Sequence, residues 1–294
     1  MTEDGRRTTK DQRLMTISHF INVNGLALHY LDWGGDGPPA VFYHATGFLA
    51  DLWAPIVEPL TARYHCFALD QRGHGQSDKP PVGAGHYNWH HTADDLEGFF
   101  DALSLRDVLA IGHSSGATTI AMVAGRRPEL IAQAVLIEPT ARSRAAPFSA
   151  ERAMQLVERT RKRRARWPSR DDMYADLVAR QSYAAWRPDV LRLYVEAGTR
   201  MTESGEVELR CAPEVEAELY SHFGEINPFD HFGAMRCPAL VMQGIGPSAW
   251  PTTPGDEVAA AMVNARLVKI KEGGHLVAME APHKVSEAIA EFLV

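Results

Sequence analysis

The chain has 294 residues, which is long enough for one large domain or for a core with an insertion. Its hydrophobic fraction of 45% and charged fraction of 23% are typical of a globular enzyme, and its net charge of −7 argues against nucleic acid or an anionic membrane as the main partner. No apolar run is long enough for a transmembrane helix, and the polar first ten residues lack the apolar stretch of a signal peptide. The three cysteines, Cys66, Cys211 and Cys237, are not clustered. We therefore expect a cytoplasmic protein with no disulfide framework and no metal site. We also expect no cofactor.

Residues 1–16 are expected to form a disordered tail. Two apolar or alternating runs that follow, Phe20–Val23 and Leu26–Leu31, are typical of a strand hairpin. Six further runs alternate with helical patterns: Ala40–Tyr43, Cys66–Leu69, Val108–Ile111, Ala134–Ile137, Ala239–Met242 and Leu267–Ile270. This alternation predicts a mostly parallel, eight-stranded sheet that is covered by helices on both faces.

Two of the helical patterns carry clear start signals. In one, Leu96 and Phe99 lie on an apolar face, and Thr92 followed by Asp95 predicts a capping box at its start. The C-terminal helix is expected to start at Pro282, which suits a first helical turn.

The alternation is interrupted between about Thr140 and Asn227. This region has no strand signal and only helical stretches: Glu151–Thr160, Arg170–Ala179 and Pro188–Ala197. We expect residues 140–227 to form a helical lid that is inserted after the sixth strand, between core segments 17–139 and 228–294. Residues 140–170 contain ten basic and two acidic side chains. They are expected to form a solvated lid face, or else to attract an anionic substrate.

A G-x-S-x-G pattern, Gly112 to Gly116, lies between the run Val108–Ile111 and a helix-like stretch. This context is typical of a nucleophile elbow, in which a serine occupies a strained turn between a strand and a helix. Ser114 is therefore the candidate nucleophile. It needs a base, and His275 follows the last strand-like run after two glycines. The oxyanion donors are expected to be the amides of Ser115 and of Thr46, in the loop after the third strand.

Four motifs in this order resemble the α/β-hydrolase fold family, in its lidded form, over about residues 17–294. They are His44-Ala45-Thr46-Gly47-Phe48, Asp70-Gln71-Arg72-Gly73-His74-Gly75-Gln76-Ser77, the elbow, and Gly273-Gly274-His275. The resemblance implies a Ser114–His275 hydrolase. We expect the Asp70–Ser77 motif to form a structural turn rather than a catalytic element, with Asp70 buried and hydrogen-bonded. We expect His44 to brace its own turn.

The chain departs from the family at the triad acid. The family's usual acid follows the seventh strand, but here that position is Pro247, which cannot orient an imidazole. Glu138 ends the sixth strand-like run, and some members of the family carry their acid there. We therefore assign Glu138 as the acid. Asp256 and Glu257 are the alternatives, and they are more typical of a helix start.

Four aromatic residues are candidates for the substrate pocket: Phe48, Trp167, Trp186 and Trp250. The resulting prediction is a serine hydrolase, monomeric or homodimeric, that cleaves a carboxylic ester or lactone of a small, largely apolar substrate. A C–C bond hydrolase, a perhydrolase or a thioesterase on the same triad remains an alternative. A non-catalytic ligand-binding protein is the alternative from another class.

Overall fold

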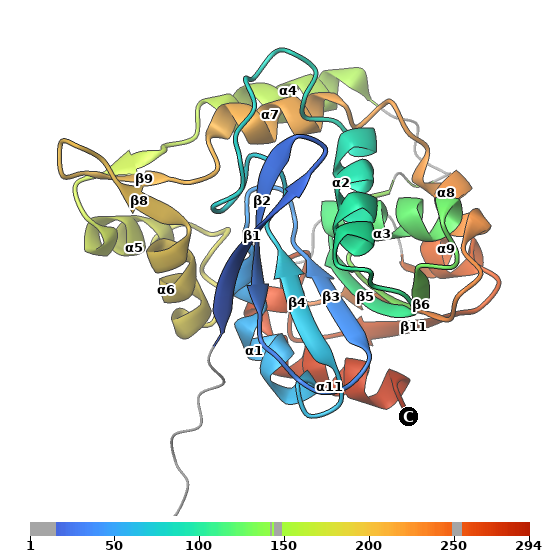
Figure 1. Ribbon diagram of the computed structural model, residues 1–294. Coiled ribbons are helices and arrows are strands. Elements are labelled where there is room, and N and C mark those ends of the chain that lie inside the picture. Colours follow the sequence, from blue (N-terminus) through green and yellow to red (C-terminus); the bar gives the residue numbers. More distant parts are fainter. Residues whose placement is uncertain (1–15, 142, 144–148, 249–254) are drawn as a thin grey trace, which may run out of the picture.

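The computed structural model describes residues 16–141, 143, 149–248 and 255–294. Its centre is an eight-stranded sheet with the strand order β1-β2-β4-β3-β5-β6-β10-β11 (Figure 1). In chain order these strands are Ile17–Val23, Leu26–Asp32, Pro39–Tyr43, His65–Leu69, Val108–His113, Ile131–Ile137, Ala239–Gly244 and Ala265–Ile270. The strands from β3 onward pair in parallel, whereas β2 pairs antiparallel with both β1 and β4. Each predicted run lies within one of these strands, so the predicted sheet is confirmed.

Helices cover both faces of the sheet (Figure 1). The helix residues Leu96, Ile120 and Phe232 belong to one buried apolar cluster, and the helix residues Ile56 and Val285 belong to another. Because both faces are covered, β5 is buried along its whole length. The helices of the core are η1 (Ala50–Trp53), α1 (Ala54–Val57), η2 (Glu58–Leu60), α2 (Trp89–Ala102), α3 (Ser115–Arg126), α8 (Pro228–Ala234), α9 (Gly255–Ala260), α10 (Val277–Glu280) and α11 (Pro282–Phe292).

The start of α2 differs from the prediction. Its N-cap is Asn88, whose side chain accepts a hydrogen bond from the His91 amide. Thr92 lies inside the first turns, and its hydroxyl donates to the Trp89 carbonyl instead. Asp95 is not a capping residue, because its carboxylate accepts two hydrogen bonds from Arg72. Pro282, in contrast, lies in the first turn of α11 as predicted.

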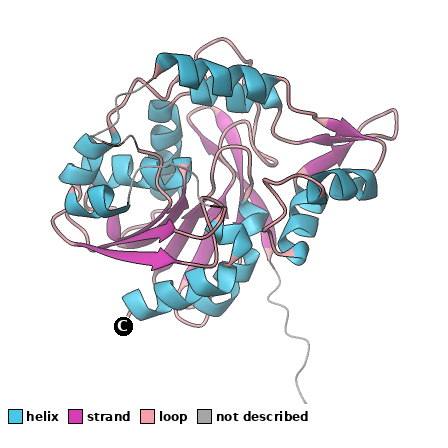
Figure 2. Cartoon of the chain, turned by 180° about the vertical axis from the view of Figure 1, so that it is seen from behind, coloured by secondary structure: helices cyan, strands magenta, loops and turns pink. Residues whose placement is uncertain are grey.

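We call residues 140–227 the inserted segment. Its helices α4 (Ala150–Arg161), α5 (Arg170–Val178) and α6 (Pro188–Ala197) match the predicted stretches, and α7 (Pro213–Ser221) follows. The expectation of a purely helical insertion is wrong, because the segment also contains a three-stranded antiparallel sheet, which lies apart from the large sheet (Figure 2). Its strands are β7 (Arg166–Trp167), β8 (Thr199–Met201) and β9 (Val207–Leu209). Strands of two or three residues are too short to display an alternating pattern in the sequence.

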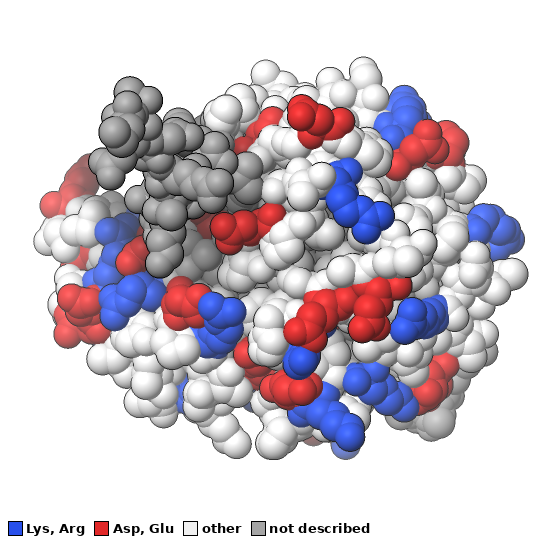
Figure 3. All heavy atoms as spheres, turned by 90° about the horizontal axis from the view of Figure 1, so that it is seen from below, with Lys and Arg blue, Asp and Glu red and all other residues white. Residues whose placement is uncertain are grey.

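Several basic residues of the inserted segment pair with acidic side chains. Arg166 pairs with Glu208 and Arg163 pairs with Glu216. On the face that Figure 3 shows, acidic and basic side chains are interspersed. Of the helices in the described ranges, none has the length and apolar character needed to cross a membrane.

Candidate active site

The candidate nucleophile Ser114 lies between β5 and α3 in a backbone conformation with φ 52° and ψ −115°, which few non-glycine residues adopt. The two flanking glycines make this turn possible. A Cβ atom on Gly112 would lie 2.6 Å from the Ala117 nitrogen, and one on Gly116 would lie 2.2 Å from the Tyr43 carbonyl oxygen. The turn is therefore available only to a sequence with glycine at both positions.

Ser114 and His275 lie within hydrogen-bond distance, with 3.0 Å between Oγ and Nε2. On the other side of the imidazole, Nδ1 is 3.2 Å from Oε2 of Glu138. A carboxylate can only accept a hydrogen bond, so Nδ1 carries the imidazole proton and Nε2 is left to accept the Ser114 hydroxyl. This arrangement can remove a proton from Ser114 and stabilise the imidazolium that forms.

The backbone at the end of β6 directs Glu138 toward His275. Glu138 has a φ of 48° and is buried, and its Oε1 accepts the Gly244 amide at 2.7 Å. Gly244 itself packs against the histidine loop, where an added Cβ would lie 2.2 Å from the Gly274 carbonyl oxygen. The end of β10, just before the loop where an acid is usual in the family, therefore lends a backbone amide to Glu138.

The alternative acids lie elsewhere. Asp256 is an exposed residue in the first turn of α9, and its carboxylate pairs with Lys269 at 2.7 Å. Glu257, beside it, accepts a hydrogen bond from Ser143 at 2.7 Å. Both are helix-start residues, as the sequence suggested.

Two further side chains hold the histidine loop, and sequence reasoning did not identify either. His113 donates from Nε2 to the carbonyl oxygen of His275 at 2.7 Å, and Glu280 accepts the Gly274 amide at 2.6 Å. Burial and the neighbouring His275 lower the pKa of His113 to about 3, so this imidazole remains a neutral donor. His113 lies within the elbow motif, which was the available signal.

The predicted oxyanion residues lie side by side. The Thr46 amide donates to Oγ of Ser115 at 2.8 Å, and the Thr46 hydroxyl lies 3.0 Å from the same atom. In this structure the Ser115 hydroxyl oxygen is thus the acceptor of the Thr46 amide hydrogen. An oxyanion could accept from Thr46 and from the Ser115 amide only after this hydroxyl turns away.

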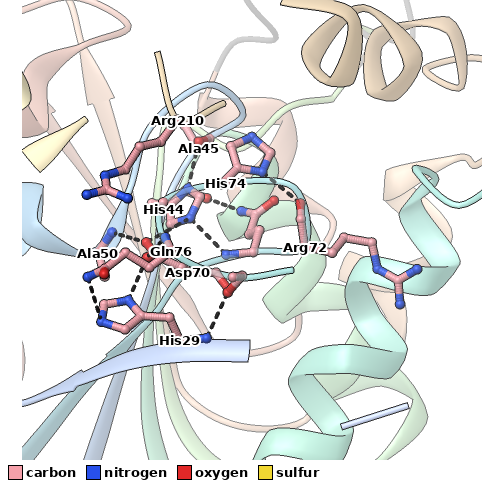
Figure 4. Close-up of polar contacts among 12 residues, drawn as sticks. His29, His44, Ala45, Ala50, Asp70, Arg72, His74, Gln76 and Arg210 are labelled. Atoms are coloured by element: carbon pink, nitrogen blue, oxygen red, sulfur yellow. Dashed lines mark hydrogen bonds and ion pairs between the residues drawn. The ribbon is translucent and has the colours of Figure 1, made fainter. Parts of the chain in front are cut away.

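Two buried imidazoles, those of His44 and His74, brace the Thr46 loop and lie near Ala45 in Figure 4. The Gly47 amide donates to Nε2 of His74 at 2.9 Å, and His44 donates from Nδ1 to the Ala45 carbonyl at 2.8 Å. Burial lowers the pKa of both histidines, for His74 to about 3. Neutral imidazoles therefore brace the loop, and the expectation for His44 agrees with this geometry.

Asp70 forms the centre of the same network (Figure 4). Its carboxylate is fully buried and accepts from the Ala50 and Gln76 amides and from His29, at 2.7 to 2.9 Å. Burial alone raises a carboxyl pKa, but the hydrogen bond from His29 and the nearby His44 hold the pKa of Asp70 below its usual value. This arrangement agrees with the structural role expected for Asp70.

Two of the predicted pocket residues meet at the elbow. The ring of Phe48 stacks on His113 with 6.4 Å between centroids, and Trp186 packs against Phe48 with 5.5 Å between ring centroids.

The other two predicted pocket residues are not seen there. Trp167 is buried inside the inserted segment, where its indole nitrogen donates to Asp176. Trp250 lies outside the described residues. A small, mostly apolar cavity beside the elbow is lined by His44, Ala45, Phe48, Leu52, Trp53, His113, Ala278 and Met279.

A buried ion pair also borders the Thr46 loop, and the sequence did not reveal it. Arg163 contacts both carboxylate oxygens of Glu216, at 2.7 and 3.2 Å. A Cβ atom on Gly47 would lie 2.8 Å from Oε2 of Glu216, so the carboxylate rests directly on this loop. Burial raises the pKa of Glu216, and Arg163 opposes this shift. The inserted segment therefore brings a charged pair to the oxyanion loop, whereas the substrate predicted from the sequence is largely apolar.

Comparisons with known proteins agree with the fold. A model of the alpha/beta hydrolase family matches residues 39–288. Over 194 residues, 64% of each chain, the sequence is 28% identical to the 2-(acetamidomethylene)succinate hydrolase of Mesorhizobium japonicum. It is 30% identical over 249 residues to a non-heme haloperoxidase of Rhodococcus erythropolis, covering 83% of this chain and 87% of the relative. The crystal structure of E-2-(acetamidomethylene)succinate hydrolase superposes with a TM-score of 0.81 at 23% identity, over 95% of this chain and 99% of that one.

Proposed function

Because the chain belongs to the α/β-hydrolase family, we propose that it is a serine hydrolase that cleaves a carboxylic ester or lactone through an acyl-enzyme. The observation that carries the proposal is the continuous hydrogen-bonded chain from Ser114 through His275 to Glu138. The relatives named as hydrolases support the reaction class.

In the first half-reaction Ser114 attacks the carbonyl carbon while His275 takes its proton. Glu138 orients the imidazole and stabilises its positive charge. The developing oxyanion accepts hydrogen bonds from the amides of Thr46 and Ser115, and the Ser115 hydroxyl leaves the Thr46 amide as it forms. His275 then protonates the leaving group.

In the second half-reaction a water molecule attacks the acyl group with His275 as its base. The inserted segment acts as a lid over this site, with Phe48 and Trp186 against the acyl group. The Arg163–Glu216 pair favours a substrate with a polar group on the side of the Thr46 loop. The succinate in the name of the Mesorhizobium relative is consistent with such a substrate.

A fluorophosphonate probe tests the proposal, because it labels only an activated serine. We expect stoichiometric labelling of the folded chain at Ser114 and none of Ser114→Ala. A panel of p-nitrophenyl esters, lactones and thioesters then identifies the bond. Absence of both labelling and turnover in the folded protein would contradict the proposal and favour a ligand-binding role.

A further inference from the structure

Besides the His275 imidazole, Ser114 has a second polar neighbour, a hydroxyl group that is not part of the triad. Oγ1 of Thr140 lies 3.1 Å from Oγ of Ser114. Thr140 follows Glu138 by two residues, on the segment that leaves β6. Its amide donates to the Ser114 carbonyl at 3.3 Å, and its own carbonyl accepts the Thr118 hydroxyl at 2.7 Å. The backbone of Thr140 is thus fixed against the start of α3, with its side chain facing the nucleophile.

The positions of the protons determine the direction of this hydrogen bond. Nε2 of His275 accepts the single proton of the Ser114 hydroxyl, because Nδ1 carries its proton toward Glu138. Oγ of Ser114 can then only accept from Thr140. The Thr140 hydroxyl is therefore a donor aimed at the oxygen atom that forms and later breaks the acyl bond.

We propose that Thr140 is a catalytic residue of the second half-reaction, in which its hydroxyl stabilises Oγ of Ser114 as the leaving group. The inference rests on the proposed function. Water adds to the acyl carbon and loses a proton to His275. The bond from carbon to Oγ then breaks, its electron pair stays on Oγ, and His275 returns the proton to that oxygen. Thr140 donates a hydrogen bond throughout and transfers no proton.

The effect differs between the two half-reactions because their starting states differ. In the free enzyme Oγ is a hydroxyl oxygen and already accepts from Thr140, so the attack gains little from this donor. In the acyl-enzyme Oγ is an ester oxygen, a poorer acceptor, and negative charge develops on it as the bond breaks. A hydrogen bond that strengthens only in the transition state accelerates that step.

The test is a stopped-flow measurement with p-nitrophenyl acetate, whose phenolate is released on acylation. We expect Thr140→Val to lower the deacylation rate constant about tenfold, the equivalent of about 1.4 kcal/mol of hydrogen bonding. Both kcat and KM of the Thr140→Val variant should therefore fall together. Its kcat/KM, which reports acylation, should stay within about twofold of the wild-type value. The phenolate burst should become larger. The Thr140→Ser variant, which keeps the hydroxyl, should retain the wild-type rate constants.

Two results would overturn this role. One is a loss of kcat/KM equal to the loss of kcat, which indicates a general structural defect. The other is a variant indistinguishable from the wild type. Thr140→Ala provides a second hydroxyl-free variant if Thr140→Val does not fold, with circular dichroism as the check. Failure of the proposed function itself looks different, because the wild-type chain then neither releases phenolate nor reacts with fluorophosphonate.

Discussion

Glu138 contacts two elements at once: its Oε2 lies 3.2 Å from Nδ1 of His275, and its Oε1 accepts the Gly244 amide at 2.7 Å. One carboxylate, directly after β6, thus joins the histidine loop to the last residue of β10. The position of Pro247 contains no acid, but the strand that precedes it still helps to orient the imidazole, through a backbone amide.

Glu138→Gln tests this relationship. The amide keeps the size of the side chain but can no longer stabilise the imidazolium, and it favours the wrong tautomer of His275. We expect kcat for ester hydrolysis to fall by about three to four orders of magnitude with the fold intact. Asp256→Asn is the matched control and should leave kcat unchanged, because its carboxylate pairs with Lys269. The opposite pattern would assign the acid to Asp256.

His113→Phe tests whether the elbow histidine positions His275. The substitution keeps a ring against Phe48 but removes the donor to the His275 carbonyl. Small displacements of a catalytic base are costly, so we expect kcat to fall at least about tenfold while the melting temperature changes little. His113→Gln retains an N–H at a similar reach and should recover part of the loss. Equal activity of His113→Phe and the wild type would show that this contact is dispensable.

Gly47→Ala tests whether the contact between Gly47 and the Glu216 carboxylate, which we call the clamp, holds the oxyanion loop in place. Gly205→Ala is its control. Both glycines have positive φ, 86° and 84°, so alanine should cost each about 1–2 kcal/mol of stability. Only at Gly47 does the new methyl group meet a neighbour, the carboxylate of Glu216, whereas no atom lies within 4 Å at Gly205. Urea unfolding should therefore report a loss of stability for both variants, and a larger one for Gly47→Ala, where the Glu216 carboxylate must also move. Ester hydrolysis should fall at least about tenfold for Gly47→Ala alone, and a fall in both variants would refute a local clamp.

Asp51 should make stability depend on pH. Burial, and after it the neighbouring Asp70, raises the pKa of Asp51 from 3.8 to about 6. Because the folded-state pKa lies above the unfolded value, this contribution is complete below pH 3.8 and is lost as the pH rises through about 6.

Asp51→Asn should therefore raise the urea midpoint at pH 7 relative to the wild type and remove much of the decline between pH 4 and 7. Asp36→Asn, at an exposed position, serves as the control. It should not flatten the dependence of the urea midpoint on pH. A wild-type midpoint that does not fall over this range would contradict the assignment.

Much of the architecture follows from local patterns. Apolar runs located the strands of the large sheet, because a strand buried on both faces needs a continuous run of apolar side chains. The pairing of Gly112 and Gly116 around Ser114 indicated the elbow, because both glycines are required by contacts close to the turn. The small sheet of the inserted segment was missed, since its strands are two or three residues long.

The sequence by itself therefore determined the main sheet, the elbow with Ser114, and His275 and Glu138 as residues to seek at one edge of that sheet. Only the tertiary structure decided which groups surround them. Thr140 lies 3.1 Å from Ser114 although 26 residues separate them, and Arg163 meets Glu216 across 53 residues. No periodicity or motif encodes such contacts. They arise where distant segments converge: α7 brings Glu216 onto Gly47, and the segment after β6 brings Thr140 to the start of α3.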